Sequence, residues 1–519
     1  MKSIFTFLSL FMSMFIVLQG QNSIPKVDNI QTELRTIDKK IIVRFDVQDV
    51  ENDSIRVRLK ASTDGEFYQI IDSGLSGDIG DNIGGGQKTI TWAYPESTDL
   101  QNISLKLSIW DHVIPDVGFW VNQVSEDIIR QYMDTIEGRR HYSTSRNKLE
   151  SVKNFIHTDF VDKGLSTYRQ DFIHLSQNGQ NIIGRKPGLI NENRSWIIDA
   201  HFDSVSNSPG ADDNASGVCG VLEMARVLED YALADNVVFI GFDFEEAGLI
   251  GATRYVSSGI RTYEKIQGVY NMEMIGYYSD EPNSQTLPTG FNILFPEVSA
   301  AVANDQFRGN FLTNIGNTAS ASLIATIQSS AAQWVPELKV HPLAVLGNGS
   351  VAPDLRRSDH APFWDAGIKA LMLTDGSNFR NQNYHTPGDS SGTLDFTFMT
   401  RVVKTILGAV STSAQPLNGK QYNLGGFTTK THDHQHTRPL ISLYPNPAQT
   451  TANVRILGMG DRLFRVRLMN TEGTILKTNH MYGMSEIQMP LDGLYAGLYL
   501  VVIDSGELTM TKELMIGGQ

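Results

Sequence analysis

Four short apolar runs in the middle of the chain limit its fold more than any other feature. Each is rich in Val, Ile, Leu or Phe and has the length of a buried strand; the runs are 196–200, 237–242, 266–270 and 370–373. Between them lie segments such as Gly217 to Leu228, whose apolar residues recur at the spacing of a helix with one buried face. This alternation predicts an α/β domain over residues 117–412, with a mostly parallel sheet flanked by helices.

The segments on either side of this domain alternate apolar and polar residues over short stretches. Residues 40–46 show the alternation before the α/β domain, and residues 464–468 show it after. Because alternation is typical of strands with one buried face, we expect a small Ig-like β-sandwich over 24–116 and a second β-sandwich over 440–519. A chain of 519 residues is long enough for about three domains.

A polar segment separates the α/β domain from the C-terminal sandwich. Residues 413–439 contain a cluster of His432, His434 and His436. Alternate residues of a flexible segment seldom form a fixed metal site, so this range is predicted to be a linker.

The first residues have the pattern of a secretory signal peptide. Lys2 precedes an apolar run from Ile4 to Leu18, and small and polar residues follow, so we expect residues 1–20 to be removed on export. No later segment is apolar over the ~20 residues that a spanning helix needs, and no transmembrane segment is expected after signal removal. Cys219 is the only cysteine, which excludes an intramolecular disulfide. The net charge of −14 argues against nucleic acid as a partner.

Histidine and carboxylate side chains follow the apolar runs, at the sheet edge where open α/β sheets gather their active sites. Zinc prefers imidazole nitrogen and carboxylate oxygen where no thiolate is available. Two histidines and three carboxylates suit two zinc ions if one carboxylate bridges them. The candidate ligands are His201, Asp213, Glu273, His385 and one of the pair Glu245 and Glu246.

The adjacent pair Glu245 and Glu246 can divide two tasks. One carboxylate coordinates a metal, and the other accepts the proton of the attacking water and passes it to the leaving amine. Adjacent acids are also common on solvated surfaces, but the apolar run before this pair argues against an exposed position. Asp203, close to His201 in the sequence, is a candidate to hold the His201 imidazole in its metal-binding tautomer.

At these residues the sequence resembles the bacterial leucyl aminopeptidase family of co-catalytic zinc exopeptidases, which also includes glutamate carboxypeptidase II and the zinc glutaminyl cyclases. The resemblance covers about Gly138 to Leu407, and six motifs carry it in order: 201–204, 210–217, 244–248, 271–276, 358–363 and 384–389. It implies a zinc exopeptidase fold, with two Zn²⁺ ions as cofactors and peptides as substrates.

The same resemblance implies a role for each residue. Asp213 bridges the two ions and Glu245 is the general base. Glu246 and His385 complete one metal site, and His201 and Glu273 complete the other.

The family usually has aspartate where this chain has Glu273, so the longer side chain is expected to change the denticity of that ligand or weaken its site. Asp359 and His360, from the motif 358–363, are assigned to the wall of the substrate pocket or to positions behind the ligands.

The C-terminal segment is similar to the sorting domain of the type nine secretion system. The similarity rests on Tyr444-Pro445-Asn446-Pro447 near its start and on the glycine- and tyrosine-rich stretch 493–499 near its end. It implies the outer-membrane secretion machinery as a partner, export through the periplasm, and a secreted or cell-surface location.

We therefore expect a secreted aminopeptidase that hydrolyses the N-terminal peptide bond with a metal-bound hydroxide and a glutamate general base. A glutaminyl cyclase is the nearest alternative, because it shares Asp213, Glu246 and His385 but needs a single metal. A glutamate-releasing carboxypeptidase would need a basic cluster for the substrate carboxylate. The alternative outside the enzymes is a surface adhesin, which would not need Glu245.

Overall fold

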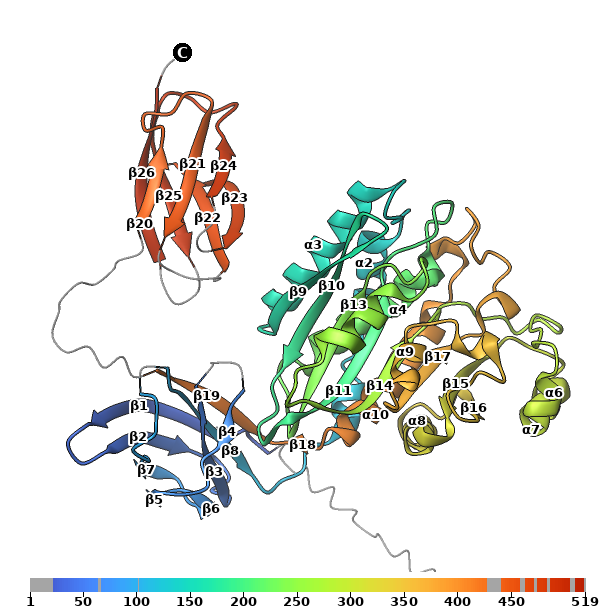
Figure 1. Ribbon diagram of the computed structural model, residues 1–519, viewed down its shortest axis with the longest axis horizontal. Helices are drawn as coiled ribbons and strands as arrows, with labels where there is room; N and C mark the ends of the chain where they lie inside the picture. Colours follow the sequence, from blue (N-terminus) through green and yellow to red (C-terminus); the bar gives the residue numbers. More distant parts are fainter. Residues whose placement is uncertain are drawn as a thin grey trace, which may run out of the picture. The chain divides into compact units, whose positions relative to one another are not determined.

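The chain divides into two compact units, Met1–Thr428 and Thr429–Gln519, and each is described by itself (Figure 1). The computed structural model describes residues 22–63, 67–100, 102–426, 440–457, 463–470, 474–482, 486–504 and 509–517. The predicted signal peptide 1–20 and the histidine cluster 432–436 lie outside these ranges. Within them, none of the helices combines the length and apolar character needed to cross a membrane.

An eight-stranded sheet forms the centre of the first unit, in the order β16-β15-β17-β14-β11-β13-β10-β9. The middle strands β17, β14, β11 and β13 are parallel, whereas β9, β10 and β15 make antiparallel pairings toward the edges. The expected parallel sheet is therefore confirmed as the middle of a mixed sheet. The strands are β9 (Ser166–His174), β10 (Gln177–Lys186), β11 (Asn191–His201), β13 (Asp235–Phe242), β14 (Lys265–Met272), β15 (Phe311–Asn317), β16 (Lys339–Val345) and β17 (Ala370–Thr374).

Helices cover both faces of this sheet. Successive side chains of a strand point to opposite faces, so Val237 and Phe239 of β13 enter one apolar cluster while Val238 and Ile240 enter another. The first cluster is covered by α1 (Val117–Val121), α2 (Glu126–Ile136), α3 (Arg146–Asp162), α4 (Gly217–Leu228), α8 (Ala321–Trp334) and α10 (Phe396–Ser413). The second is covered by α5 (Ile250–Arg254), α6 (Phe291–Leu294) and α9 (His360–Asp365).

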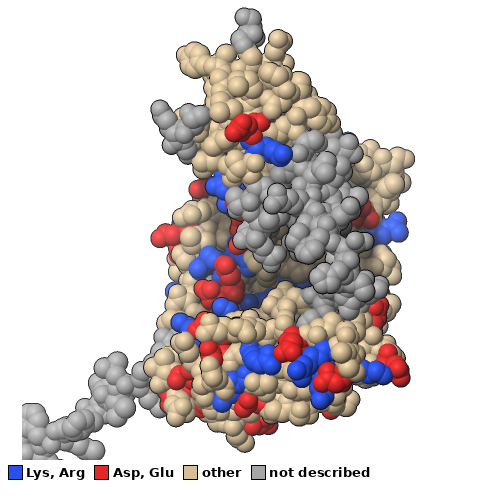
Figure 2. Space-filling model, turned by 90° about the vertical axis from the view of Figure 1, so that its left-hand side faces the viewer, with Lys and Arg blue, Asp and Glu red and all other residues tan. Residues whose placement is uncertain are grey.

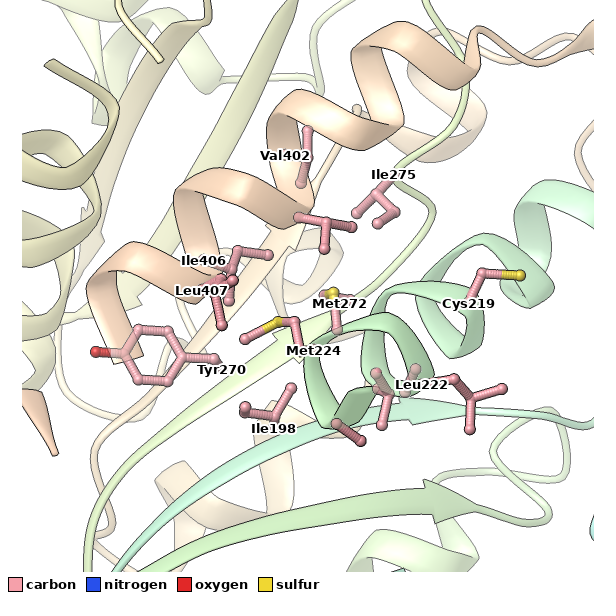
Figure 3. Packing of buried hydrophobic residues seen from close by; sticks show 14 of the residues in the cluster. Ile198, Cys219, Leu222, Met224, Tyr270, Met272, Ile275, Val402, Ile406 and Leu407 are labelled. Atoms are coloured by element: carbon pink, nitrogen blue, oxygen red, sulfur yellow. The ribbon is translucent and has the colours of Figure 1, made fainter. Parts of the chain in front are cut away.

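The first cluster holds α4 firmly against the sheet. Figure 3 shows Met224 of α4, Met272 of β14 and Ile406 of α10 among the buried side chains between these elements. Cys219 is buried in the same cluster, and burial raises the pKa of its thiol well above the usual value. Cys219 is therefore a small core side chain, and α4 is a fixed platform for the turn that precedes it.

The N-terminal sandwich consists of two sheets, in the orders β1-β2-β7-β5 and β19-β8-β3-β4, with β6 paired to β3. On the face shown in Figure 2, basic and acidic side chains are interspersed over the lower part of the molecule. In the N-terminal sandwich, Arg44 and Glu33 on neighbouring strands form one such pair of opposite charges, with Nη1 and Oε2 2.9 Å apart. The strands are β1 (Lys26–Arg35), β2 (Lys40–Gln48), β3 (Ile55–Ser62), β4 (Gln69–Ile70), β5 (Leu75–Gly77), β6 (Gly80–Ile83), β7 (Gly86–Ala93), β8 (Ser104–Asp111) and β19 (Gly419–Gly426).

The last strand of this sandwich, β19, corrects the predicted linker 413–439. The chain leaves α10, forms β18 (Pro416–Leu417), and returns to pair β19 with the edge of β8. Tyr422 and Leu424 pack against the sandwich core, and the Tyr422 hydroxyl accepts a hydrogen bond from the Val27 amide at 2.9 Å. The linker expectation is wrong for residues 416–426, because an edge strand with few apolar side chains has a polar composition.

Buried contacts join the sandwich to the α/β domain. Lys60 is fully buried, with Nζ 2.9 Å from Glu192 Oε1 and 3.0 Å from the carbonyl oxygen of Gly188. Phe67 stacks on Tyr263 with ring centroids 4.1 Å apart. A buried charge pair that also hydrogen-bonds the main chain requires a fixed domain contact, so these two domains form one body.

The second unit is a β-sandwich with sheets in the orders β20-β21-β24 and β23-β22-β25-β26. Val454, Phe464, Val466 and Leu514 are among the fully buried residues of its core. The strands are β20 (Leu440–Tyr444), β21 (Thr451–Leu457), β22 (Leu463–Met469), β23 (Ile475–Tyr482), β24 (Glu486–Pro490), β25 (Gly497–Asp504) and β26 (Thr509–Ile516).

Candidate metal centre

The five candidate metal ligands and the candidate base Glu245 gather at one edge of the central sheet. Parallel strands end at the same edge, which explains how residues far apart in the chain meet there. His201 is the last residue of β11, and Asp213 lies in the turn η1 (Ala211–Ser216). Glu245 and Glu246 follow β13, Glu273 directly follows β14, and His385 lies in the loop after β17.

Five of these residues form two groups that share Asp213. One group is His201, Asp213 and Glu273, and the other is Asp213, Glu246 and His385; in each, the candidate ligand atoms lie within 4.8 Å of one another. Asp213 places Oδ1 3.4 Å from His201 Nε2 and Oδ2 3.0 Å from His385 Nε2. One carboxylate therefore faces both groups, which is the arrangement a bridging ligand requires.

Each group has a second carboxylate of its own. Glu273 Oε2 lies 3.3 Å from His201 Nε2, and Glu246 Oε2 lies 3.2 Å from His385 Nε2. The two groups thus have the same composition, one imidazole and one private carboxylate around a shared aspartate.

Several polar atoms of this cluster are buried without a hydrogen bond among the described residues. They are both ring nitrogens of His201, Asp213 Oδ2 and His385 Nε2. An unsatisfied buried polar atom costs about 1–3 kcal/mol, so such atoms normally have a partner. Imidazole nitrogens and carboxylate oxygens without thiolates are a donor set that zinc accepts. The residues therefore fit the metal ions that the sequence predicts.

The carboxylates of the cluster repel one another. Burial and then the nearby Asp213 raise the pKa of Glu246 to about 7. Burial alone would lower the pKa of His385, but its contacts with Asp213 and Glu246 outweigh this effect and raise the pKa to about 10. A site that concentrates negative charge in this way favours cations.

Glu245 stands beside both groups but belongs to neither. Its Oε2 atom is 3.9 Å from His201 Nε2, and its side chain is 12% exposed. Burial raises the pKa of Glu245 well above the usual value, and the neighbouring Glu273 and Glu246 add to the increase. A carboxylate with a raised pKa, next to ligands but not among them, is placed to accept a proton.

Asp203 holds the loop that carries the two glutamates. Its Oδ1 lies 3.5 Å from His201 Nδ1, on the side of the ring away from Asp213. Both of its carboxylate oxygens accept main-chain hydrogen bonds, from the amides of Glu245 at 3.1 Å and Glu246 at 3.2 Å. Asp203 thus connects the His201 ring to the Glu245–Glu246 loop, a connection that sequence spacing could not show.

Three residues at the site adopt left-handed backbone conformations without being glycine. They are Phe244 at φ 60°, Met274 at φ 51° and His385 at φ 58°. Each is a candidate ligand or lies next to a candidate ligand or the candidate base. Such conformations cost about 1–3 kcal/mol each and concentrate at functional sites, where the surrounding structure enforces them.

Ser358, Asp359 and His360 lie near the candidate ligand Glu273 but do not line the cavity beside it. Ser358 donates its hydroxyl hydrogen to Glu273 Oε2 at 2.8 Å. Asp359 and His360 are fully buried, and neither lines the cavity beside Glu273. His360 Nε2 lies 3.0 Å from the Leu355 carbonyl oxygen. Asp359 directly precedes the short helix α9 and His360 is its first residue, and both are interior side chains.

Two further residues contribute to the site through their contacts. Asp389 accepts hydrogen bonds from the amides of Asp212 at 2.9 Å and Asp213 at 3.2 Å, which fixes the turn that presents the shared carboxylate. Tyr384 stacks on His385 with ring centroids 3.7 Å apart. Both lie in the motif 384–389, but only the fold shows what they touch.

A cavity opens beside Glu273. Arg357 and Tyr384 are at its rim, where the Arg357 guanidinium donates to the Tyr384 hydroxyl at 2.8 Å. Most of the wall is apolar: Leu287, Phe291, Val302, Phe311, Ile315, Leu343, Met372 and Phe379. The cavity can therefore take a bulky apolar group next to the candidate metal centre.

Comparison with known protein families finds a match for the central domain and another for the C-terminal sandwich. Residues 181–410 match the model of peptidase family M28. Residues 442–517 match the model of the secretion system C-terminal sorting domain.

Individual relatives share the central part of the chain. The uncharacterized protein YfbL of Escherichia coli is 28% identical over 54% of this chain and 85% of its own length. Aminopeptidase YwaD of Bacillus subtilis is 30% identical over 41% of this chain, which spans only 40% of the length of that relative. The solved zinc aminopeptidase BSAP of Bacillus subtilis is 25% identical, with 46% of this chain and 52% of that chain covered and a TM-score of 0.36.

The resemblance drawn from the six motifs is confirmed by the family match over residues 181–410. The sorting-domain match makes the protein a secreted or cell-surface protein. The match of the central domain to peptidase family M28 over residues 181–410 supports a metallo-exopeptidase of the hydrolase class.

Proposed function

We propose that this protein is an aminopeptidase that uses two zinc ions to release the N-terminal residue of peptides. The observation that carries the proposal is the pair of ligand groups that share Asp213, with Glu245 beside both. His201, Asp213 and Glu273 would hold one ion, and Asp213, Glu246 and His385 would hold the other. The name of the relative YwaD, an aminopeptidase, supports the reaction class.

When bound, two zinc ions polarise the scissile carbonyl and lower the pKa of the attacking water. Glu245 accepts the proton of that water and passes it to the leaving amine, because it is close to both ligand groups and keeps its own carboxylate free. Asp203 accepts hydrogen bonds from the main-chain amides of Glu245 and Glu246, which keeps both glutamates in place.

The apolar cavity beside Glu273 would bind the side chain of the residue that is released. Its wall of leucine, phenylalanine, isoleucine and methionine favours bulky apolar side chains over charged ones. Of the described residues that line it, Arg357 alone is cationic, and its guanidinium already donates to Asn378 and Tyr384. A single engaged arginine favours an aminopeptidase over an enzyme that clamps a glutamate carboxylate.

The secretion route is part of the same proposal. The C-terminal sandwich would direct the protein through the periplasm to the type nine machinery of the outer membrane, after removal of the signal peptide at residues 1–20. The sorting-domain match supports this route.

Aminoacyl anilides test the reaction directly. We expect hydrolysis of leucyl and phenylalanyl anilides, little hydrolysis of glutamyl anilide, and loss of all turnover in a chelator with recovery on adding zinc. N-acetyl-leucyl anilide is the matched control, since an aminopeptidase needs the free amine. Turnover that survives the chelator, or equal turnover of the acetylated substrate, would contradict the proposal.

A further inference from the structure

One arginine is completely buried beneath the loops that carry the candidate ligands. Arg140 has no exposed surface. Its main-chain amide donates to Ser204 Oγ at 2.9 Å, and its carbonyl oxygen accepts from the Ser204 amide at 3.2 Å. The guanidinium donates only to main-chain carbonyl oxygens, those of Ile136, Gly138, Phe202, Pro209 and Gly210.

Two of these carbonyls belong to the segments that hold the candidate ligands His201 and Asp213. Phe202 directly follows His201, and Arg140 Nε donates to its carbonyl oxygen at 2.7 Å. Gly210 opens the turn that leads to Asp213, and Arg140 Nη2 donates to its carbonyl oxygen at 2.7 Å. A guanidinium presents its five N–H groups in a rigid planar fork, so one side chain fixes both segments at a set separation.

The turn closes on this guanidinium without spare room. Gly210 has a left-handed backbone, with φ at 63°. A Cβ atom there would lie 2.4 Å from the Asp213 carbonyl oxygen and 2.8 Å from Arg140 Nη2. The backbone before Asp213 therefore follows the shape of the arginine, and a different side chain at position 140 would leave it unsupported.

We propose that Arg140 is a positioning residue for the metal centre, which sets the separation of His201 and Asp213 and so the affinity of the buried ligand group for its ion. The inference rests on the proposed function. Lysine in this place keeps the charge but has one nitrogen, so it cannot serve the carbonyls of Phe202 and Gly210 together.

The test compares three arginine-to-lysine variants of the full chain. Arg140→Lys removes the fork. Arg139→Lys changes the exposed neighbour. Arg380→Lys changes another fully buried arginine, which donates to Gln285 Oε1 and to the carbonyl oxygens of Tyr277 and Phe311, and not to the segments around His201 and Asp213. Zinc affinity is measured by competition with a chromogenic chelator, and thermal unfolding of the same samples reports on the fold.

We expect Arg140→Lys to bind zinc about 10–100-fold more weakly, the usual effect of losing a residue that orients metal ligands. Arg139→Lys should match the parent protein, and Arg380→Lys should unfold at a lower temperature with unchanged zinc affinity. Equal zinc affinity in Arg140→Lys and the parent, or an equal loss in Arg380→Lys, would overturn the proposal.

A milder variant serves if Arg140→Lys does not fold. Ser204→Ala removes the hydrogen bond between the Arg140 main chain and the segment after His201, and we expect a smaller loss of zinc affinity in the same direction. Unchanged affinity in that variant would count against the proposal. Because the readout is zinc binding, a parent protein that binds zinc but hydrolyses no anilide would refute the proposed function and leave the role of Arg140 standing.

Discussion

The two ligand groups of the candidate metal centre have the same composition but differ in their exposure to solvent. The side chains of His201 and Glu273 are 1% and 7% exposed, and both lie at the ends of regular strands. In the other group the Glu246 side chain is 8% exposed, but His385, which lies in a loop, is 35% exposed. Asp213 connects the two and is 3% exposed.

This difference indicates a division of labour. Strand ends, Ser358 and Arg140 fix the buried group, whereas in the exposed group Asp203 holds the main chain of Glu246 and the His385 ring stacks on Tyr384. A substrate can approach from the side of His385, while the buried group keeps a constant geometry. Variants separate the two groups, first through the ligand that they share and then through the ligands of each group.

The largest effect is expected for Asp213→Asn, because both groups lose their shared ligand. We expect loss of both zinc ions and of measurable activity, checked by metal analysis and anilide turnover. Asp212→Asn is the matched control. Burial raises the pKa of Asp212 well above the usual value. Its two carboxylate oxygens accept hydrogen bonds from the Asn381 side-chain amide and the Gly276 main-chain amide, so Asp212 is not a candidate ligand and its variant should keep both ions.

Next in size is Glu245→Gln, which leaves both groups intact. The variant should retain both zinc ions and the parent unfolding temperature while turnover falls by about 10² to 10⁴-fold, the range for loss of a general base. Parent-like turnover with full zinc content would remove Glu245 from the mechanism.

Glu273→Gln and His385→Gln should each affect one group. We expect one zinc ion per chain in each variant and a partial loss of activity, smaller than for Asp213→Asn. Loss of both ions in both variants would show that the groups bind zinc only together, which would break the comparison.

The smallest effect concerns the rate of zinc release. Chelation of the parent protein should proceed in two phases, because a ligand that is 35% exposed is more accessible than one that is 1% exposed. The fast phase should disappear in His385→Gln and remain in Glu273→Gln. A single phase in the parent would mean that exposure does not distinguish the groups.

The sequence predicts much of this site because its ligands follow apolar runs that become parallel strands. His201, Glu245, Glu246 and Glu273 are found this way, since a sheet edge brings strand ends together. It could not show that Arg140, rather than the adjacent Arg139, is the buried one. Two neighbouring arginines look alike until the helix that precedes them ends and turns one inward.

The fold shows the same limit. Apolar runs predict the central sheet, but a polar edge strand such as β19 has no such signal, and its partner β8 lies far away in the chain. The wall of the cavity is equally hidden, because Phe291, Leu343 and Met372 come from separate elements that meet only after folding.

Metal content tests the central claim most directly. The protein, freed of metal and then dialysed against a saturating free zinc concentration, is analysed for zinc per chain by mass spectrometry of the elements. Two ligand groups around Asp213 predict two zinc ions per chain, one of them bound by His201, Asp213 and Glu273. One zinc ion per chain at saturation would contradict the two-metal account and favour the single-metal cyclase instead.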